Sequence, residues 1–356
     1  MKCAVSRSFG IFLASLGILL LACSNSVQEI SEAEDCPLLY SILAVFAPNG
    51  LGDKSYNDNI YRSLREIAKE QENVAIESYT PVDMDDAKGV VQRWIEEGKA
   101  AAVKNFVSKR MLLLTDASFY EILRDNESLR NSGNDAILWL DSSNPDSMNV
   151  YSRYISLYGV SYLAGQIVHG LGVQKASAVL ANPNIEALSQ SLAGFSDGFR
   201  SAGGKFDSTD VHYLSNNISG GFDESDSLYR LSYRLDSLGY GFVFPMAGGS
   251  NAGLLRYTRE QADTNMFLTC GVDVDQQDYS QNVAFSIVKR MDLIVKNFIG
   301  EWMDDMEMDL SETYSILDNF VDIVVADGYD NAIGKYVSER NEAAEAEMMY
   351  YGALLK

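Results

Sequence analysis

Residues 176–202, ASAVLANPNIEALSQSLAGFSDGFRSA, contain the pattern that decides the fold: a short apolar run followed by an amphipathic stretch. The run is typical of a buried strand over 176–181, and the spacing after it predicts a helix over 185–202. The same alternation continues on both sides. Before it, strands are predicted over 39–46, 74–79, 111–114 and 136–140, and helices over 59–69, 85–97, 116–123 and 159–171; after it, strands over 210–215, 240–246 and 266–272, and helices over 224–238, 252–262 and 339–356.

Strands that alternate with helices form parallel sheets with right-handed crossovers, covered by helices on both faces. The alternation is interrupted at residues 149–158 and again after Asp273. We therefore predict an α/β protein of two lobes, each a parallel sheet flanked by helices, with a cleft between them. The N-terminal lobe is predicted over 38–155 with a return segment at about 276–305, and the C-terminal lobe over 156–275 with about 306–356.

The N-terminal segment is typical of an export signal. Lys2 and Arg7 precede a mostly apolar run over 9–22, which is shorter than the ~20 residues that span a bilayer. Cys23 ends this run and resembles the cysteine of a bacterial lipobox. This predicts a signal peptide over 1–22 and a lipidated Cys23; a plain secretory signal with an incidental cysteine is the alternative.

The lipobox interpretation places the chain outside the cytoplasm, tethered by its lipid, with residues 23–37 as the lipidated cysteine and a flexible polar stalk. Cys36 and Cys270 are then left as thiols in an oxidising compartment. They can pair, but nothing local in the sequence brings them together.

The charge balance limits the possible partners. The 356 residues include 28 Lys and Arg against 50 Asp and Glu, a net charge of −22. Nucleic acid is excluded as a partner because its phosphates require a basic surface. The balance suits a binder of neutral or cationic small molecules. The two histidines, His169 and His212, argue against a histidine-rich metal site or a histidine-driven hydrolase.

Three segments resemble cofactor-binding, catalytic or calcium-binding motifs, but each lacks a required glycine. Gly50-Leu51-Gly52 begins like a dinucleotide fingerprint, but Ser55 stands at the third glycine position. Residues 248–252, GGSNA, lack the last glycine of a nucleophile elbow. Asp273-Val274-Asp275 begins like a calcium loop, but Asp278 replaces the required glycine. We therefore expect no catalysis, no metal and no cofactor.

The loops that follow the strands are the expected place for a ligand. Ligands of parallel sheets bind beyond the carboxyl ends of the strands, and two lobes can turn these ends toward one cleft. Four such loops have unusual polar content: residues 47–57, 115–119, 245–251 and 271–275.

The first of these loops contains NGLGDKSYN at 49–57, which resembles the G-x-x-D-K-S-F-N loop of the basic membrane protein family, with Tyr56 in place of Phe. The resemblance covers about residues 38–300. It implies a clamshell similar to periplasmic-binding proteins of type I, and a lipoprotein that binds substrate for an ABC transporter. The best-known members resemble purine nucleoside receptors. Four further segments resemble family motifs in the same order: SLYGVSYLAG at 156–165, FPMAGG at 244–249, CGVDVDQ at 270–276 and SIVKR at 286–290.

A purine nucleoside requires aromatic faces for its base and polar groups for its edges and ribose. Tyr56 and Phe244 come from loops of opposite lobes and are candidates to stack on the base, with ordinary core packing as the alternative for each. Asn57 both donates and accepts, which suits a purine edge. Gly248 and Gly249 allow backbone N–H groups to approach a ligand closely.

Four charged residues complete the predicted site. Asp53 either binds ligand or caps the helix that follows it. Asp116 has the same two interpretations, and the resemblance implies a ligand-contacting carboxylate in this region. Asp273 follows an apolar strand and can accept both vicinal hydroxyls of a ribose. The resemblance implies that Lys289 contacts the ligand. We expect Lys289 to pair with Asp273, because a lone buried lysine is costly.

We predict a lipid-anchored solute-binding protein of an ABC importer, which captures a nucleoside or purine-like compound by closing its lobes. Its predicted partners are this ligand, a membrane permease and the membrane itself. It is expected to be a monomer in the bacterial cell envelope, facing the periplasm or the exterior. The alternatives are a sensing lipoprotein without a transporter and a nucleoside hydrolase. A hydrolase of this kind is expected to bind calcium through a cluster of aspartates, and the single Asp273-Val274-Asp275 supports it only weakly.

Overall fold

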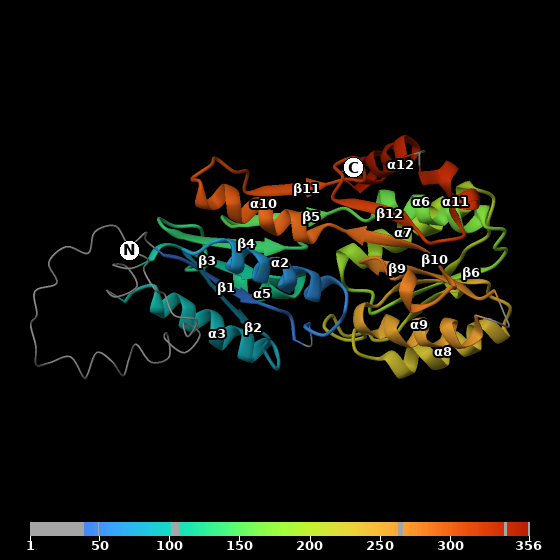
Figure 1. Cartoon of the computed structure of the whole chain (residues 1–356), viewed down its shortest axis with the longest axis horizontal. Coiled ribbons are helices and arrows are strands. Elements are labelled where there is room, and N and C mark those ends of the chain that lie inside the picture. The colour runs from blue at the N-terminus through green and yellow to red at the C-terminus, as the bar shows by residue number, and fades with distance from the viewer. Residues whose placement is uncertain (1–38, 49, 101–106, 263–265, 338–339, 355–356) are drawn as a thin grey trace, which may run out of the picture.

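The structure is a computed structural model that describes residues 39–48, 50–100, 107–262, 266–337 and 340–354. Two α/β lobes lie end to end along the long axis of the molecule (Figure 1). The predicted signal peptide, Cys23, the stalk and Cys36 lie outside the described residues. Within those residues, no helix is long and apolar enough to cross a membrane.

The first lobe is built on six strands in the order β11-β5-β4-β3-β1-β2, and every pairing is parallel. All four strands predicted for this lobe are confirmed, and β5 and β11 are additional. The strands are β1 (Leu39–Val45), β2 (Val74–Tyr79), β3 (Val107–Leu114), β4 (Asp135–Leu140), β5 (Tyr151–Ile155) and β11 (Ser311–Tyr314), and the helices are α2 (Tyr56–Glu70), α3 (Met84–Glu97), α5 (Tyr120–Arg124) and α10 (Met291–Met303).

The second lobe has a sheet of the order β12-β10-β9-β8-β6-β7, parallel except for the antiparallel edge strand β12. The predicted strands and helices between residues 159 and 273 are confirmed. The strands are β6 (Ala176–Leu180), β7 (Val211–Tyr213), β8 (Phe242–Met246), β9 (Leu268–Asp273), β10 (Val283–Lys289) and β12 (Val321–Val325), and the helices are α6 (Tyr158–Gly170), α7 (Glu186–Ser201), α8 (Ser225–Ser237), α9 (Asn251–Gln261), α11 (Asp330–Val337) and α12 (Arg340–Leu354).

The described chain crosses between the sheets three times: after β5, after β10 and between β11 and β12. The segment that returns to the first lobe is therefore α10 and β11. The predicted return at about 276–305 contains α10 but begins too early, because it includes β10, and it ends too early, because β11 was assigned to the second lobe with 306–356. The reason lies in the apolar run VAFSIVK, which forms β10 and pairs with β9 in the second sheet, with Ile287 opposite Val272.

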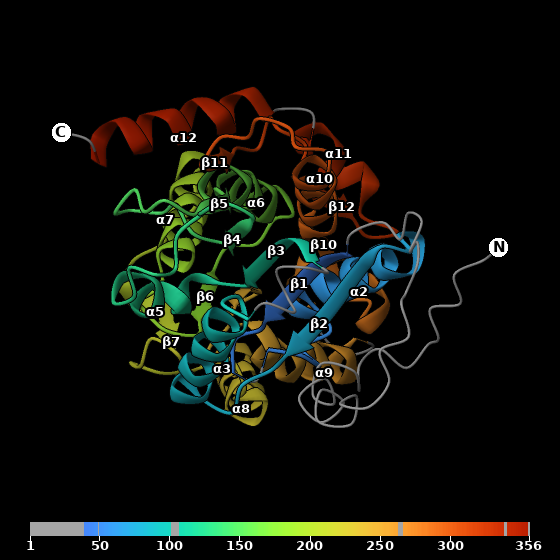
Figure 2. The ribbon, with the colours of Figure 1, turned by 90° about the vertical axis from the view of Figure 1, so that its left-hand side faces the viewer.

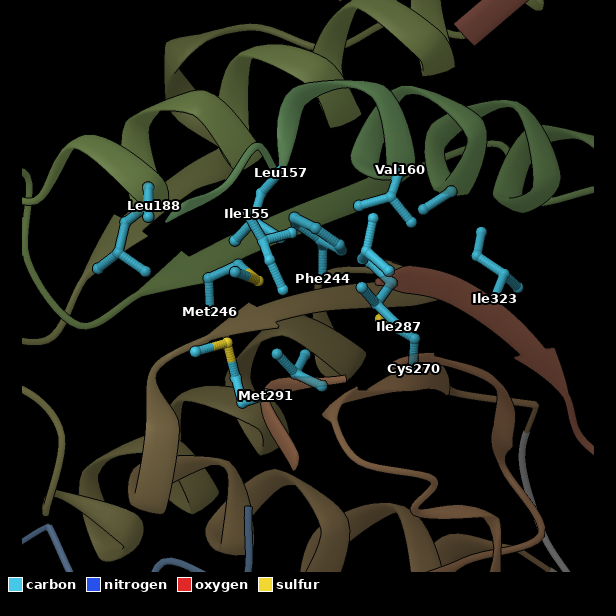
Figure 3. Packing of buried hydrophobic residues seen from close by; sticks show 14 of the residues in the cluster. Ile155, Leu157, Val160, Leu188, Phe244, Met246, Cys270, Ile287, Met291 and Ile323 are labelled. Atoms are coloured by element: carbon cyan, nitrogen blue, oxygen red, sulfur yellow. The ribbon is translucent and has the colours of Figure 1, made fainter. Parts of the chain in front are cut away.

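A stack of phenylalanines forms the centre of the second lobe. Phe244 on β8 is fully buried, and its ring lies parallel to that of Phe195 on α7 at 4.3 Å between centroids. Figure 3 shows Phe244 among other apolar side chains, including Leu157 and Val160. The prediction that Phe244 stacks on a ligand is therefore replaced by its alternative, core packing. A strand covered on both faces has no solvent side to which this ring can point.

Cys270 belongs to the same core. Its thiol is fully buried on β9 with no disulfide partner among the described residues, and burial raises its pKa. Cys36, the other thiol that the sequence leaves after Cys23, lies outside the described residues, so whether the two pair stays open.

Candidate functional site

The predicted polar residues gather where the carboxyl ends of both sheets meet, between the lobes. The first lobe provides the loop before α2 and the ends of β3 and β4, and the second provides the ends of β9 and β10. This is the position at which parallel sheets bind ligands. The contacts below describe how each side chain is held there.

Asp53 organises the loop between β1 and α2. Its carboxylate accepts hydrogen bonds from the backbone N–H of Ser55 at 2.8 Å, of Asn57 at 2.9 Å and of Asp58 at 3.2 Å. It also accepts from the Asn57 side chain at 2.9 Å. These donors are free backbone groups at the start of a helix, so the structure favours the capping interpretation of Asp53.

Asn57 retains one unused group. Its amide nitrogen donates to Asp53, whereas its Oδ1 atom is buried and has no hydrogen-bond partner among the described residues. Because buried polar atoms are nearly always bonded, this oxygen is a candidate acceptor for a ligand donor. The loop also requires glycine at position 50, where a Cβ would lie 2.9 Å from the Ala47 carbonyl oxygen and 3.0 Å from Asn57.

Asp273 bridges the lobes. It is the last residue of β9 and has φ of 68°, a left-handed conformation uncommon outside glycine. Its carboxylate accepts a hydrogen bond from Ser55 Oγ at 2.9 Å, and the same hydroxyl lies 3.0 Å from the Val272 carbonyl. Burial raises the pKa of Asp273 to about 6, while Lys289 and the Ser55 hydrogen bond oppose the rise.

Lys289 bridges the lobes at a second point, but with a partner that the sequence did not predict. Its ammonium, on a side chain that is only 3% exposed, lies 2.7 Å from Asp141 Oδ1 at the end of β4. The expected pairing with Asp273 is wrong as a direct contact; Lys289 is only near enough to lower the pKa of Asp273. Asp141 is thus a missed site residue. It directly follows an apolar strand, as Asp116 and Asp273 do, and that signal identifies it.

Tyr56 connects these groups. It is the first residue of α2, and its hydroxyl donates to the Thr115 carbonyl at 2.7 Å, which fixes the ring at the end of β3. The Lys289 ammonium lies over the ring, 4.6 Å from its centroid. At this distance a cation is attracted to an aromatic face.

Asp116 caps the short helix Ala117–Phe119. Its carboxylate accepts from the Ser118 backbone N–H at 2.8 Å and from the Ser118 hydroxyl. Burial raises its pKa, the Ser118 hydrogen bonds lower it, and Asp141 raises it further. The N-cap alternative therefore describes its contacts, and Asp141 and Lys289 are near enough to shift its pKa in opposite directions.

The turn at Gly248 and Gly249 fits closely against Phe222. Gly248 has φ of 53°, and a Cβ there would lie 2.9 Å from Phe222 Cδ1; at Gly249 it would lie 2.9 Å from the Phe222 carbonyl oxygen. Phe222 is half-buried in the loop after β7. It is an aromatic residue of the second lobe beside the turn that follows β8, and sequence reasoning missed it because the loop around it shows no periodic pattern.

The electrostatics of the site are dominated by carboxylates. Burial raises the pKa of the Tyr56 phenol well above its usual value, and Asp141, Asp116, Asp273 and Asp53 add to the rise. The ammonium of Lys289 offsets part of this negative charge. Such a site disfavours anions and suits a neutral or cationic ligand that offers hydrogen-bond donors.

Comparison with solved structures supports the fold. An ABC transporter solute-binding protein from Aeropyrum pernix K1 has a TM-score of 0.65 at 17% identity, over 86% of each chain. A transcriptional activator of the comK gene from Bacillus halodurans has 0.64 at 14%, over 84% of this chain and 95% of that one. An ABC transporter periplasmic solute-binding protein from Actinobacillus succinogenes 130z, with bound D-allose, has 0.59 at 12%, over 82% and 99%. At these identities the likeness concerns the fold alone.

Comparison of the sequence itself is more specific. No curated protein sequence matches the chain. The Bmp family, described as "ABC transporter substrate-binding protein PnrA-like", matches residues 41–348, which include both lobes and all the site residues above. The resemblance found in the loop at 49–57 is thereby confirmed over most of the chain. The protein belongs to the Bmp family of PnrA-like ABC transporter substrate-binding proteins.

Proposed function

We propose that this substrate-binding protein captures a nucleoside or purine-like solute and presents it to an ABC permease. The observation that carries the proposal is the meeting of an aromatic ring, Tyr56, with carboxylates from both lobes, Asp141 and Asp273, at the strand ends. An aromatic face suits a base, and a carboxylate suits the two donors of a ribose diol.

In this proposal the base stacks on Tyr56 in the position that the Lys289 ammonium holds here, and the ammonium moves to an acceptor on the ligand. Asp273 accepts hydrogen bonds from the ribose, and Asn57 Oδ1 accepts one from the base. Phe222 replaces Phe244 as the aromatic residue of the second lobe, because Phe222 is half-buried against the turn that follows β8 while Phe244 is in the core.

The proposal includes a lipid anchor at Cys23, after a signal peptide over 1–22, with the site exposed outside the cytoplasm and the protein acting as a monomer. Changing Cys23 to Ala should then release the protein from the membrane fraction. If this variant still partitions with membranes into detergent, the anchor lies elsewhere.

The deciding experiment is calorimetric titration with inosine, guanosine, adenosine and a free purine base. Tyr56→Leu and Phe222→Leu should each weaken nucleoside binding by about 2- to 12-fold, the loss expected for one stacking contact. Mass spectrometry of solute retained through native purification provides an independent identification. Wild-type protein that binds none of the nucleosides, and retains no purine, would refute the nucleoside assignment while leaving the family unaffected.

A further inference from the structure

The C-terminal helix α12 places a buried carboxyl group at the first crossing between the lobes. Glu347 is 3% exposed, and its Oε1 accepts hydrogen bonds from the Ser156 hydroxyl and, at 3.3 Å, from the Gly159 backbone N–H. Ser156 and Gly159 belong to the segment that leaves β5 of the first sheet and enters α6. Tyr351, one turn along α12, donates to the same Ser156 hydroxyl at 2.8 Å. Figure 2 shows α12 on the outside of the molecule, above β11 and α6.

The same carboxyl group meets a second crossing. Ile316 lies between β11 of the first sheet and β12 of the second, and it is 1% exposed. A Cβ placed on Gly159 would lie 3.0 Å from Glu347 Oε2 and 3.2 Å from Ile316 Cγ2, so the three residues meet at one point. Glu347 thus lies between two of the three segments that connect the two sheets.

The helix is attached without Glu347. Tyr350 stacks on Tyr158 at 4.2 Å between centroids, and Glu342 accepts hydrogen bonds from Tyr162 and Gln166. Glu347, by contrast, is directed at the crossing segments. Burial raises the pKa of its carboxyl group, and hydrogen bonds from Ser156 and from the backbone of Gly159 and Ile316 oppose the rise. A carboxyl group is costly to bury, so its position between two crossing segments calls for a role other than holding α12 in place.

We propose that Glu347 is a positioning residue for lobe closure. By bonding α12 to the crossing segments it stabilises the closed arrangement of the lobes, in which Ser55 of the first lobe contacts Asp273 of the second. It thereby shifts the ligand-free equilibrium toward that arrangement. Because the apparent affinity scales with the fraction of molecules in the competent state, Glu347 affects binding from a distance without touching the ligand.

The test is hydrogen–deuterium exchange of the full chain without ligand. Glu347→Ala should speed exchange in the remote cleft segments, residues 50–58 and 271–276, by about 2- to 12-fold, the range expected for one hydrogen bond. Glu347→Gln, which keeps the Oε1 acceptor, should restore exchange close to wild type. Glu342→Ala, on the same helix, should leave the cleft segments unchanged.

Faster exchange confined to residues 156–160 and 343–351 in Glu347→Ala would overturn the proposal, because it would show a local structural role only. If that variant does not fold, Ser156→Ala is used instead, because it removes the hydroxyl that donates to Glu347. Exchange is then measured in the same cleft segments. The comparison requires no ligand, so it remains decisive even if no nucleoside binds. Where inosine binds, its affinity for Glu347→Ala should fall as well, by no more than the factor by which the closed-to-open ratio falls.

Discussion

Asp53 and Asp116 in the first lobe are hydrogen bonded by their own loops, whereas Asp273 and Lys289 in the second lobe make polar contacts across to the first. All four are charged residues at strand ends. The difference lies in what their bonds connect. Those of Asp53 and Asp116 stabilise a turn within the first lobe, and those of Asp273 and Lys289 connect the two lobes. Substitutions in the first group should therefore affect local stability most, and those in the second should affect closure and binding.

The largest effect is expected at Lys289. Lys289→Met leaves Asp141 without its partner in a buried setting, and breaking a buried ion pair costs about 3–5 kcal/mol. The free energy of unfolding, from urea denaturation, should fall by that order. The double variant Lys289→Met with Asp141→Asn should recover most of the loss, because no charge is then left alone. If the double variant loses as much stability as the two single variants together, the pair is not coupled.

Whether a contact of the site could be predicted depends on how far apart its residues lie in the sequence. Asp53 and its loop were identified because the donors lie within five residues of it, and a helix start has a recognisable sequence. The Lys289–Asp141 pair joins residues 148 positions apart, and no spacing rule connects them. The residue after each strand could be predicted, but its partner depends on how the two lobes are packed together.

Phe244 shows a different limit. An apolar run predicts a strand in a parallel sheet, but such a strand is buried on both faces, so the pattern does not tell which ring faces a ligand. The late elements were missed for a related reason. Strand β11 is a short strand at the edge of the first sheet, and β12 pairs antiparallel at the edge of the second, so neither continues the strand–helix alternation.

Asp273 should give the next largest effect, on binding. Asp273→Asn removes a charged acceptor but keeps the side-chain shape and its contact with Ser55. Hydrogen bonds to a charged group contribute about 1.5–3 kcal/mol, so inosine affinity should fall roughly 10- to 150-fold. Calorimetry with inosine, 2′-deoxyinosine and free base distinguishes the causes. Equal losses for base and nucleoside would show that Asp273 does not bind the ribose.

Asp53 provides the contrasting case in the first lobe. Asp53→Ala removes the acceptor for three backbone N–H groups at the start of α2, and the loss of a capping side chain costs about 0.5–2 kcal/mol. Denaturation should show this loss of stability. Inosine affinity should change less than in Asp273→Asn. A larger change in affinity than at Asp273 would indicate that Asp53 also contacts the ligand.

The smallest expected effect concerns pH, and its sign differs between stability and binding. Burial raises the pKa of Asp273 in the folded protein to about 6, above that of an unfolded aspartate, so lowering the pH from 7 to 4 protonates the folded form first and increases the contribution of Asp273 to stability. The protonated carboxyl is a weaker acceptor, so inosine affinity should fall by up to about tenfold between pH 7 and 5. Asp273→Asn has no such titration, so subtracting its pH profile from that of the wild type removes the contributions of the other acids. As the pH is lowered, the wild type should gain stability and lose inosine affinity relative to the variant. If stability and affinity instead change in the same direction, the titrating group is not Asp273.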